Sequence, residues 1–365
     1  MRVQLVVLTT LVARLAHATP EDPTIATERA SVRPFLTLFN QLAQEGTFTG
    51  TALVACEGGP VLARAYGLAS REYRAPNRVS TRFSIGSLNK LFTQVAIAKL
   101  MERGSLHPSD TVAKLLPEHP ITGADRITVE HLLDHRSGLG DIFGDEYFAA
   151  DKMRFRTALD HFPLFASKPL LFEPGTSMRY SNAGYIVLGR IIEKRSGQSY
   201  DDFVREQVFQ PAGMRSTAAF DGDLPIENVA TGYTRRGVGG PLPEGEVRTN
   251  RYHFYRGSSA GGGYSTVEDL LKFARALEEG RLLSPPYTQW MLKGAPLPGQ
   301  SAPPKPPMPV KGRMFGGGAI GLNAALGFDF LEDCIVVTLA NADPPMAMEV
   351  ADRLMSLVKE PSAPK

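Results

Sequence analysis

Two side chains that could act together open a helical run of the sequence, because Ser87 and Lys90 are three residues apart. That spacing places both side chains on one face of a helix. The first turn of a helix also offers free N–H groups and the positive end of the helix dipole to Ser87. A serine becomes a good nucleophile when a base takes its proton, and burial can lower a lysine pKa from ~10.4 far enough for that role. Many helices contain Ser-x-x-Lys by chance, so the pair alone favours a helix cap and a surface lysine. It predicts acyl transfer through Ser87 only together with a second motif.

A second group of polar residues, Tyr180-Ser181-Asn182, lies between the turn 172–175 and a helical segment at 183–195. A phenolate held near a lysine ammonium can act as a general base, and an Asn amide can hold either a substrate or the lysine. Taken alone, the group favours a buried tyrosine followed by an Asn that caps a helix.

Two further patterns resemble catalytic or metal sites. Gly257-Ser-Ser259-Ala-Gly261 fits the nucleophile elbow Gly-x-Ser-x-Gly, but that elbow needs a strand before it and a helix directly after it, and a glycine-rich loop follows here. His131 and His135 are one helical turn apart, as zinc ligands can be, yet Leu132 stands where the zinc motif has Glu. We therefore interpret both patterns as structural, and we expect no metal and no organic cofactor.

The elements that must position these residues follow from the hydrophobic periodicity. Strand-forming sequence lies near both ends of the chain, at 47–56, 61–67, 316–325 and 334–340, with a hairpin through 327–333. Helical periodicity marks the segments 32–45, 88–102, 128–133, 183–195, 269–280 and 345–358, and prolines crowd an irregular segment at 294–310. We predict an α+β fold, in which both chain ends build an antiparallel sheet of about five strands flanked by helices. A mainly helical lobe (105–254) is inserted into the α/β lobe (19–104 and 255–365).

The first 18 residues have the pattern of a signal peptide: Arg2, an apolar run at 3–13, and the cleavage pattern Ala16-His-Ala18. We therefore expect an exported protein, periplasmic or secreted, with a disordered tail at 359–365. Cleavage would remove two of the 40 basic residues and leave 38 against 38 acidic residues. A neutral chain without a basic run argues against nucleic acid as a partner. No later run approaches the ~20 apolar residues of a membrane helix.

Several segments, in this order, resemble the superfamily of serine β-lactamases, low-molecular-weight penicillin-binding proteins and related esterases. They are Phe83–Lys90, His131–Leu139, Phe172–Asn182, Pro211–Met214 and Ala260–Thr266. The resemblance implies a β-lactamase-like fold in which Ser87 forms the acyl-enzyme and Lys90 and Tyr180 manage its proton. It also implies that Asn182 contacts the substrate or the lysine.

The third motif of that superfamily departs from its usual form. The strand that normally carries Lys-Thr-Gly or His-x-Gly has Phe315-Gly316-Gly317-Gly318 here. By the resemblance, Gly316 and Gly317 let the backbone approach the substrate, and the N–H groups of Ser87 and Gly318 form an oxyanion hole. Phe315 cannot bind a substrate carboxylate, and Phe-Gly-Gly is similar to the Trp-Gly-Gly of some carboxylesterases. Lys311 or Arg313 could supply the missing charge.

The resemblance also pairs the two cysteines, because it makes the strand that ends at Cys56 an antiparallel neighbour of the strand that begins at Cys334. We predict a disulfide between them, the alternative being two buried thiols. The predicted function is hydrolysis of a small ester or amide through acyl-Ser87, with esterase activity first. The alternatives are a D-amino-acid peptidase (a DD-carboxypeptidase) or a weak β-lactamase. From a different class, the alternative is a non-catalytic protein that binds β-lactams or peptidoglycan fragments.

Overall fold

The computed structural model describes residues 33–56, 59–237, 240–251, 253–300 and 310–358. The predicted signal peptide and the predicted C-terminal tail lie outside the described residues. Among the described helices, none is long and apolar enough to cross a membrane.

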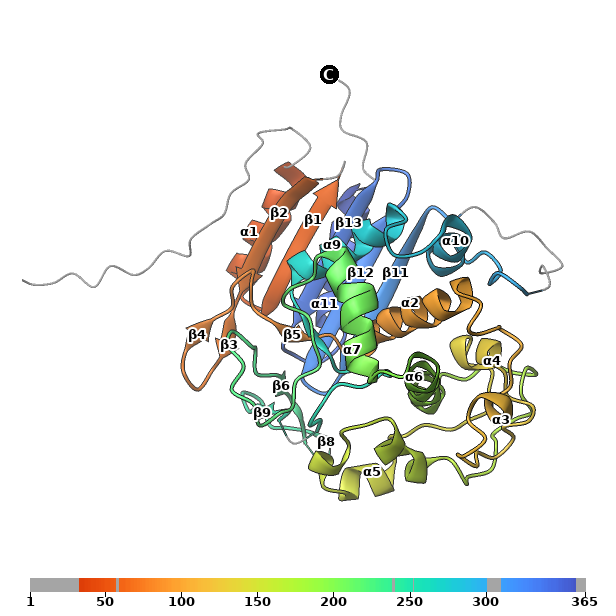
Figure 1. Cartoon of the computed structure of the whole chain (residues 1–365). Helices are drawn as coiled ribbons and strands as arrows, with labels where there is room; N and C mark the ends of the chain where they lie inside the picture. The colour runs from red at the N-terminus through yellow and green to blue at the C-terminus, as the bar shows by residue number, and fades with distance from the viewer. Residues whose placement is uncertain (1–32, 57–58, 238–239, 252, 301–309, 359–365) are drawn as a thin grey trace, which may run out of the picture.

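An antiparallel sheet of five strands forms the centre of the α/β region (Figure 1). Its strands, in spatial order, are β11 (Gly312–Ala319), β12 (Leu322–Asp329), β13 (Cys334–Ala340), β1 (Gly50–Cys56) and β2 (Gly59–Tyr66). Strands from the two chain ends meet where β1 pairs with β13, which confirms the predicted sheet. One strand boundary was wrong: 316–325 is not a single strand, because the chain turns at Gly321, whose φ is +71°. Positive φ favours glycine, and the neighbouring glycines hid this turn in the sequence.

Helices cover both faces of the sheet, so successive residues of a strand are buried on opposite sides. On one face α1 (Arg33–Glu45) and α11 (Met346–Val358) pack with Val54 and Val336. On the other face α2 (Asn89–Glu102) and α9 (Val267–Glu278) pack with Leu53 and Val337. Because α2 lies between the sheet and the helical region, it is buried almost all round, as its sequence predicted.

The middle of the chain consists mostly of short helices and loops, and one long helix, α6 (Asn182–Ser196), packs against α2. Its other helical elements are α3 (Val112–Leu115), α4 (Val129–Leu133), α5 (Asp145–Ala149), η3 (Lys152–Arg154), η4 (Leu159–Leu164), α7 (Tyr200–Val204), η5 (Arg205–Phe209) and α8 (Gln210–Ala212). The sequence analysis missed α10 (Pro285–Lys293) and eight short strands: β3 (Leu68–Ser70), β4 (Ala75–Pro76), β5 (Phe83–Ser84), β6 (Tyr233–Thr234), β7 (Arg236–Gly237), β8 (Gly240–Pro241), β9 (Arg248–Thr249) and β10 (Tyr264–Ser265). The division into two lobes stays a prediction.

The predicted disulfide is present. Cys56 lies directly opposite Cys334 in the β1–β13 register, and their sulfur atoms are bonded. The bond joins residues 278 positions apart at the end of the sheet where β13 begins. A cross-link of such a long segment restricts the unfolded chain and is worth about 5–6 kcal/mol in the chain-entropy model, whereas disulfides typically contribute about 2–4 kcal/mol.

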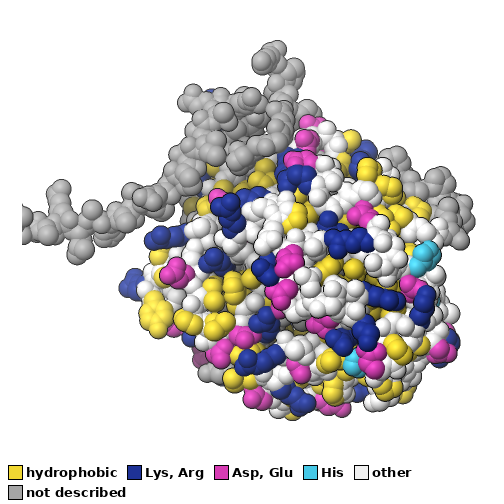
Figure 2. All heavy atoms as spheres, viewed as in Figure 1, with side chains coloured by type: hydrophobic (Ala, Val, Ile, Leu, Met, Phe, Trp, Pro, Cys, Tyr) yellow, Lys and Arg dark blue, Asp and Glu magenta, His cyan; other side chains and the backbone are white. Residues whose placement is uncertain are grey.

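Charges of both signs are interspersed on the face of the molecule shown in Figure 2. Lys and Arg side chains alternate there with Asp and Glu side chains, and no single-sign field covers that face. A mixed surface of this kind lacks the basic stripe of a nucleic-acid-binding face.

Candidate active site

Ser87 lies in a short 3₁₀ turn, η2 (Gly86–Leu88), that leads directly into α2. The turn is packed tightly against β11: a Cβ on Gly86, whose φ is +51°, would approach the Gly318 nitrogen to 3.0 Å and the Leu322 side chain to 2.9 Å. The Ile85 N–H donates to Gly263 O at 2.8 Å. The nucleophile candidate is therefore held by backbone contacts on both sides.

Lys90 is one turn further along and is only 5% exposed. Its Nζ atom donates to Ser87 Oγ at 3.2 Å, to Asn182 Oδ1 at 2.7 Å and to Ala260 O. Burial lowers the pKa of Lys90 to about 7, and the negative charge of Asp141 partly opposes this effect. Near neutral pH a substantial fraction of this amine is unprotonated and able to accept a proton.

Tyr180 contacts both Ser87 and Lys90. Its hydroxyl donates to Ser87 Oγ at 2.7 Å, and Lys90 Nζ lies 4.7 Å from the centre of its ring. The Tyr180 side chain is 47% exposed, but partial burial removes water from its phenol and raises the pKa of Tyr180 above its ordinary value. The lowered pKa of Lys90 makes its unprotonated amine available, whereas the raised pKa of Tyr180 keeps its phenol protonated. The two shifts therefore favour Lys90 over Tyr180 as the first acceptor of the Ser87 proton.

Asn182 contacts the lysine and is almost completely enclosed. Its amide nitrogen donates to both carboxylate oxygens of Asp141 at 3.0 Å. Both the oxygen and the nitrogen of the Asn182 amide are therefore bonded to protein groups. Of the two predicted contacts of Asn182, with the substrate or with the lysine, this geometry matches the contact with Lys90. Sequence reasoning missed Asp141, which directly follows the matched segment 131–139 and Gly140.

The segment 257–261, whose sequence fits a nucleophile elbow, anchors α2 through its backbone carbonyls. Three consecutive carbonyls accept side-chain hydrogen bonds from α2: Ser258 O from Asn89 at 2.7 Å, Ser259 O from Thr93 at 2.7 Å, and Ala260 O from Lys90. The Ser259 side chain is buried against Gly189 of α6 rather than facing Ser87. The segment lacks the strand and helix of a nucleophile elbow, and its backbone contacts with α2 give it a structural role.

The glycines of β11 bring the edge of the sheet against the nucleophile. A Cβ on Gly317 would lie 3.0 Å from the Ser87 nitrogen, so no side chain fits there. Gly317 O accepts a hydrogen bond from the buried Asn323 side chain at 2.9 Å. In a trans peptide the next N–H points the opposite way, so the Gly318 N–H faces away from Asn323 and toward the nucleophile turn. Asn323 was not predicted from the sequence.

Phe315 lies on the same face of β11 as Gly317, as the alternation of a strand requires. Its half-buried ring packs edge-on against Phe328 with 6.0 Å between ring centres. The Arg313 guanidinium lies 5.0 Å from the centre of the Phe315 ring. It also lies close to Gly294, where an added Cβ atom would be 3.7 Å from Arg313 Nη1. Arg313 thus lies near the Phe315 ring and the end of α10, and it precedes Gly317 by four residues in β11. Lys311 is exposed.

The two histidines have structural partners. His131 closes a capping box with Thr128 at the start of α4. His135 Nδ1 accepts a hydrogen bond from Ser181 N at 3.2 Å, and its ring packs against Tyr180 with 4.5 Å between ring centres. Burial and the nearby Lys90 lower the pKa of His135 to about 4, so His135 is neutral at physiological pH and helps to position Tyr180. In the described ranges no group of three or more His, Cys, Asp or Glu side chains could hold a metal ion.

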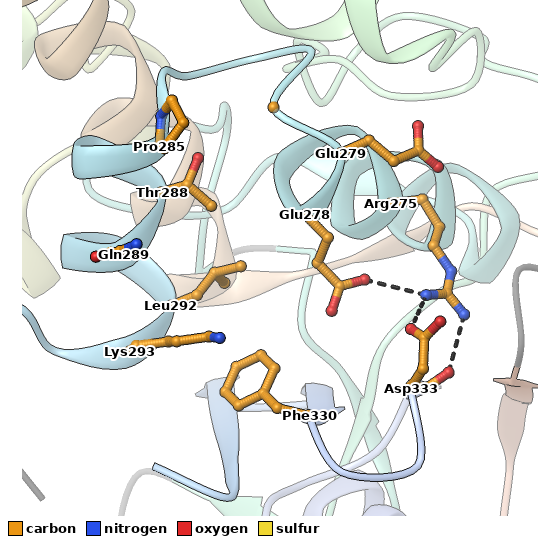
Figure 3. A pocket seen from close by; sticks show the side chains of 11 residues that line it. Arg275, Glu278, Glu279, Pro285, Thr288, Gln289, Leu292, Lys293, Phe330 and Asp333 are labelled. Carbon is orange, nitrogen blue, oxygen red and sulfur yellow. Dashed lines mark hydrogen bonds and ion pairs between the residues drawn. The ribbon is translucent and has the colours of Figure 1, made fainter. Parts of the chain in front are cut away.

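A cavity of about 580 Å³ lies elsewhere, between α9, α10 and the turn from β12 to β13 (Figure 3). Arg275 is held there between Glu278 and Asp333, and Lys293 lies over the Phe330 ring. None of the predicted site residues lines this cavity. Ser87, Lys90 and Tyr180 form a separate group, in which a buried amine and a phenol both lie within hydrogen-bonding distance of the serine hydroxyl. A neighbouring base of this kind is what activation of a serine nucleophile requires.

Comparisons with known proteins agree with this geometry. The family model described as Beta-lactamase matches residues 35–359. Esterase EstB of Burkholderia gladioli is 32% identical over 291 residues, which cover 70% of this chain and 73% of the esterase. The chain therefore belongs to the β-lactamase family of serine hydrolases.

Two penicillin-binding proteins are also similar. Penicillin-binding protein 4* of Bacillus subtilis is 35% identical over 257 residues, which cover 68% of this chain and 56% of that relative. The crystal structure of a penicillin-binding protein from Bacillus halodurans superposes with a TM-score of 0.76 at 31% identity, covering 88% of this chain and 98% of that one. This chain spans little more than half the length of the Bacillus subtilis relative.

Proposed function

We propose that the protein hydrolyses small neutral esters through a covalent acyl-Ser87 intermediate. The observation that carries the proposal is the contact of Ser87 Oγ with both Lys90 Nζ, at 3.2 Å, and Tyr180 OH, at 2.7 Å, beside a buried amine whose pKa lies near 7. A base within hydrogen-bonding distance and with a pKa near the working pH is what proton transfer from a serine requires.

In the proposed reaction, Lys90 takes the Ser87 proton as Oγ attacks the carbonyl carbon of the ester. The carbonyl oxygen becomes an oxyanion, which the N–H groups of Ser87 and Gly318 stabilise. Tyr180 donates its proton to the departing alkoxide and regains one from the Lys90 ammonium. Water then attacks the acyl carbon and gives one proton to Lys90. As the tetrahedral intermediate collapses, the bond to Ser87 Oγ breaks, Oγ receives that proton from Lys90, and the carboxylic acid is released.

The preference for neutral esters rests on Phe315. In this position a cation would attract a substrate carboxylate, whereas a carboxylate placed against a phenyl ring loses hydration and gains little in return. Arg313 is the nearest candidate for a substitute charge, because its guanidinium lies 5.0 Å from the centre of the Phe315 ring and close to Gly294 at the end of α10. Gly317 lets β11 approach the turn that carries Ser87, because a Cβ there would lie 3.0 Å from the Ser87 nitrogen.

A D-amino-acid peptidase or weak β-lactamase is the second candidate, and the similarity to penicillin-binding protein 4* favours it. The deciding experiment compares kcat/KM of the purified protein for p-nitrophenyl butyrate, a D-Ala-D-Ala peptide and a chromogenic cephalosporin. The proposal expects the neutral ester to be the best of the three. Faster turnover of the cephalosporin or the peptide would refute ester preference, and acylation without turnover would indicate a binding protein.

We also propose that the protein works outside the cytoplasm. The disulfide Cys56–Cys334 supports this location, because such bonds form and persist in oxidising compartments. A fractionation of producing cells, followed by mass measurement of the mature chain, tests both export and the expected cleavage after Ala18. Full-length protein in the cytosolic fraction would overturn the proposal.

A further inference from the structure

The buried amine of Lys90 lies over the faces of two aromatic rings. Its Nζ atom is 4.7 Å from the centre of the Tyr180 ring and 5.3 Å from the centre of the Tyr185 ring. Both tyrosine rings pack against His135, with 4.5 Å and 5.1 Å between ring centres, and we name these three rings the lysine cage. An ammonium group over the face of an aromatic ring is attracted by the negative charge of the π-electrons. The two tyrosine faces therefore favour the charged form of the lysine.

Tyr185 is the tyrosine of the cage that takes no part in the proposed proton transfers. It lies in the first turn of α6, and its side chain is only 1% exposed. Its hydroxyl accepts from Gln94 Nε2 at 2.8 Å and donates to Leu133 O at 3.2 Å, so the hydroxyl is committed to α2 and α4. Burial raises the pKa of Tyr185, which keeps its phenol neutral. The ring is thus the part of Tyr185 that acts on the lysine.

Most of the groups that surround the Lys90 amine are uncharged. Burial destabilises its ammonium form and lowers the Lys90 pKa to about 7, and the Asp141 carboxylate partly opposes this effect. Neutral oxygens of Asn182 and Ala260 accept hydrogen bonds from Nζ. The other titratable groups around the lysine, among the residues that the structure describes, are Ser87, His135, Tyr180, Tyr185 and, next to Tyr185, Asp134. His135 is neutral because its pKa is about 4, and burial keeps both phenols protonated.

We propose that Tyr185 is a positioning residue, whose ring face stabilises the Lys90 ammonium that forms when Ser87 gives up its proton. This inference rests on the proposed function, in which Lys90 is the base. During acylation the proton moves from Ser87 Oγ to Lys90 Nζ, while the electron pair of Oγ forms the bond to the carbonyl carbon. The ammonium must then persist in a buried site, and a ring face favours a cation without competing for its proton. A second carboxylate in that place would raise the Lys90 pKa too far for a base at neutral pH.

The test changes the charge on the ring face of residue 185 and keeps the shape of the ring. Tyr185→Phe is made first, and mono-, di- and trifluorinated phenylalanines are then introduced at the same position by amber suppression, because each fluorine withdraws π-electron density. The Lys90 pKa is read by NMR from the pH dependence of its Cε resonance in protein labelled with carbon-13 lysine, assigned by its absence in Lys90→Ala. We expect Tyr185→Phe to keep a pKa close to the wild-type value, and fluorination to lower it progressively by roughly half to one unit in total. A pKa that stays constant along the series would overturn the inference.

The matched control is the same fluorinated series at Tyr200. This tyrosine is buried in α7, and its hydroxyl lies 2.8 Å from Thr93 Oγ1 of α2, the helix to which Tyr185 also bonds. The series at position 200 should leave the Lys90 pKa in place. A fall as large as that at position 185 would assign the shift to altered packing and would overturn the role of the ring face.

The pH profile of kcat/KM for a neutral ester separates positioning in the reaction from a merely structural contact. Its acid limb should move to lower pH together with the Lys90 pKa, and the plateau should fall, because a weaker base takes the Ser87 proton more slowly. Tyr185→Leu, which lacks a ring, should show the same two changes. A Lys90 pKa that moves while the acid limb stays fixed would overturn the inference, because the ring would then not act in the reaction.

The NMR titration needs no ester turnover, so failure of this inference and failure of the proposed function are distinguishable. A Lys90 pKa that follows the fluorine series in a protein that hydrolyses no ester would support the stabilising ring face although esterase activity had failed. Ester hydrolysis in a protein whose Lys90 pKa ignores the series would refute the ring face and leave the proposed function standing.

Discussion

Asp141→Asn tests how the site sets the pKa of its base. Asp141 accepts two hydrogen bonds from Asn182, and its negative charge raises the Lys90 pKa against the larger effect of burial. An asparagine keeps the size and one acceptor oxygen but removes the charge. Since Lys90 acts as a base only when unprotonated, activity must rise with pH through about 7, and the variant must move this rise to lower pH.

The size of the shift follows from Coulomb's law. The two hydrogen bonds and the intervening amide separate the Lys90 and Asp141 charges by roughly 7 Å, and Asp141 is exposed, so an effective dielectric constant of about 40 is appropriate. The interaction is then about 1 kcal/mol, which corresponds to somewhat less than one pKa unit. The midpoint of the acid limb should therefore fall by roughly half to one pH unit, and by less in 1 M salt.

The assay is a profile of kcat/KM for a neutral ester from pH 5 to 9, with product measured by chromatography so that the detection does not depend on pH. Asp145→Asn is the matched control, an exposed aspartate in the first turn of α5, and should leave the midpoint in place. His135 does not interfere, because its pKa lies near 4. An unchanged midpoint in Asp141→Asn, or an upward shift, would refute the assignment of the acid limb to Lys90.

Further predictions concern the other parts of the site and the fold. Lys90→Ala and Tyr180→Phe should each lower kcat/KM by about 10²-fold or more while circular dichroism shows a folded protein, and near-full activity of Tyr180→Phe would exclude the proposed proton route. Phe315→Lys should raise the kcat/KM ratio of a cephalosporin to a neutral ester, with Phe315→Leu as the uncharged control, and an unchanged ratio would show that this position does not select charge. Asn323→Ala should lower kcat more than it raises KM, because the Gly317 peptide loses the donor that orients it, and a change confined to KM would contradict an oxyanion role. Reduction of Cys56–Cys334 should lower the free energy of unfolding by about 2–4 kcal/mol in urea titrations, whereas coincident curves would show that the bond adds nothing to stability.

The parts of the structure that the sequence predicted are those set by local periodicity or by a recognisable motif. The spacing of Ser87 and Lys90 fixes their common face, and the all-round apolar pattern of the following helix predicted its burial. Tyr180 is 93 residues from Ser87, so periodicity alone could not bring the two together. The family resemblance placed them in one site, and it likewise paired Cys56 with Cys334.

Other features depend on the direction of single hydrogen bonds, which no pattern of residue types specifies. Asp141 is one of 38 acidic residues, and its importance follows only from the orientation of the Asn182 amide. Asn323 matters because its side chain reaches back to Gly317 O. The glycine-rich second half of β11 has weak strand propensity, so the turn at Gly321 and the true strand limits emerged only from the pairing with β12.

The central claim is that Ser87 is the acylated residue, and the most direct measurement is covalent labelling followed by peptide mapping. The mature protein is treated with a fluorophosphonate, its mass is measured intact, and the labelled peptide is sequenced by tandem mass spectrometry. We expect one adduct, located on Ser87, which is absent in Ser87→Ala and fully present in Ser259→Ala. An adduct that persists in Ser87→Ala, or that disappears in Ser259→Ala, would contradict the account.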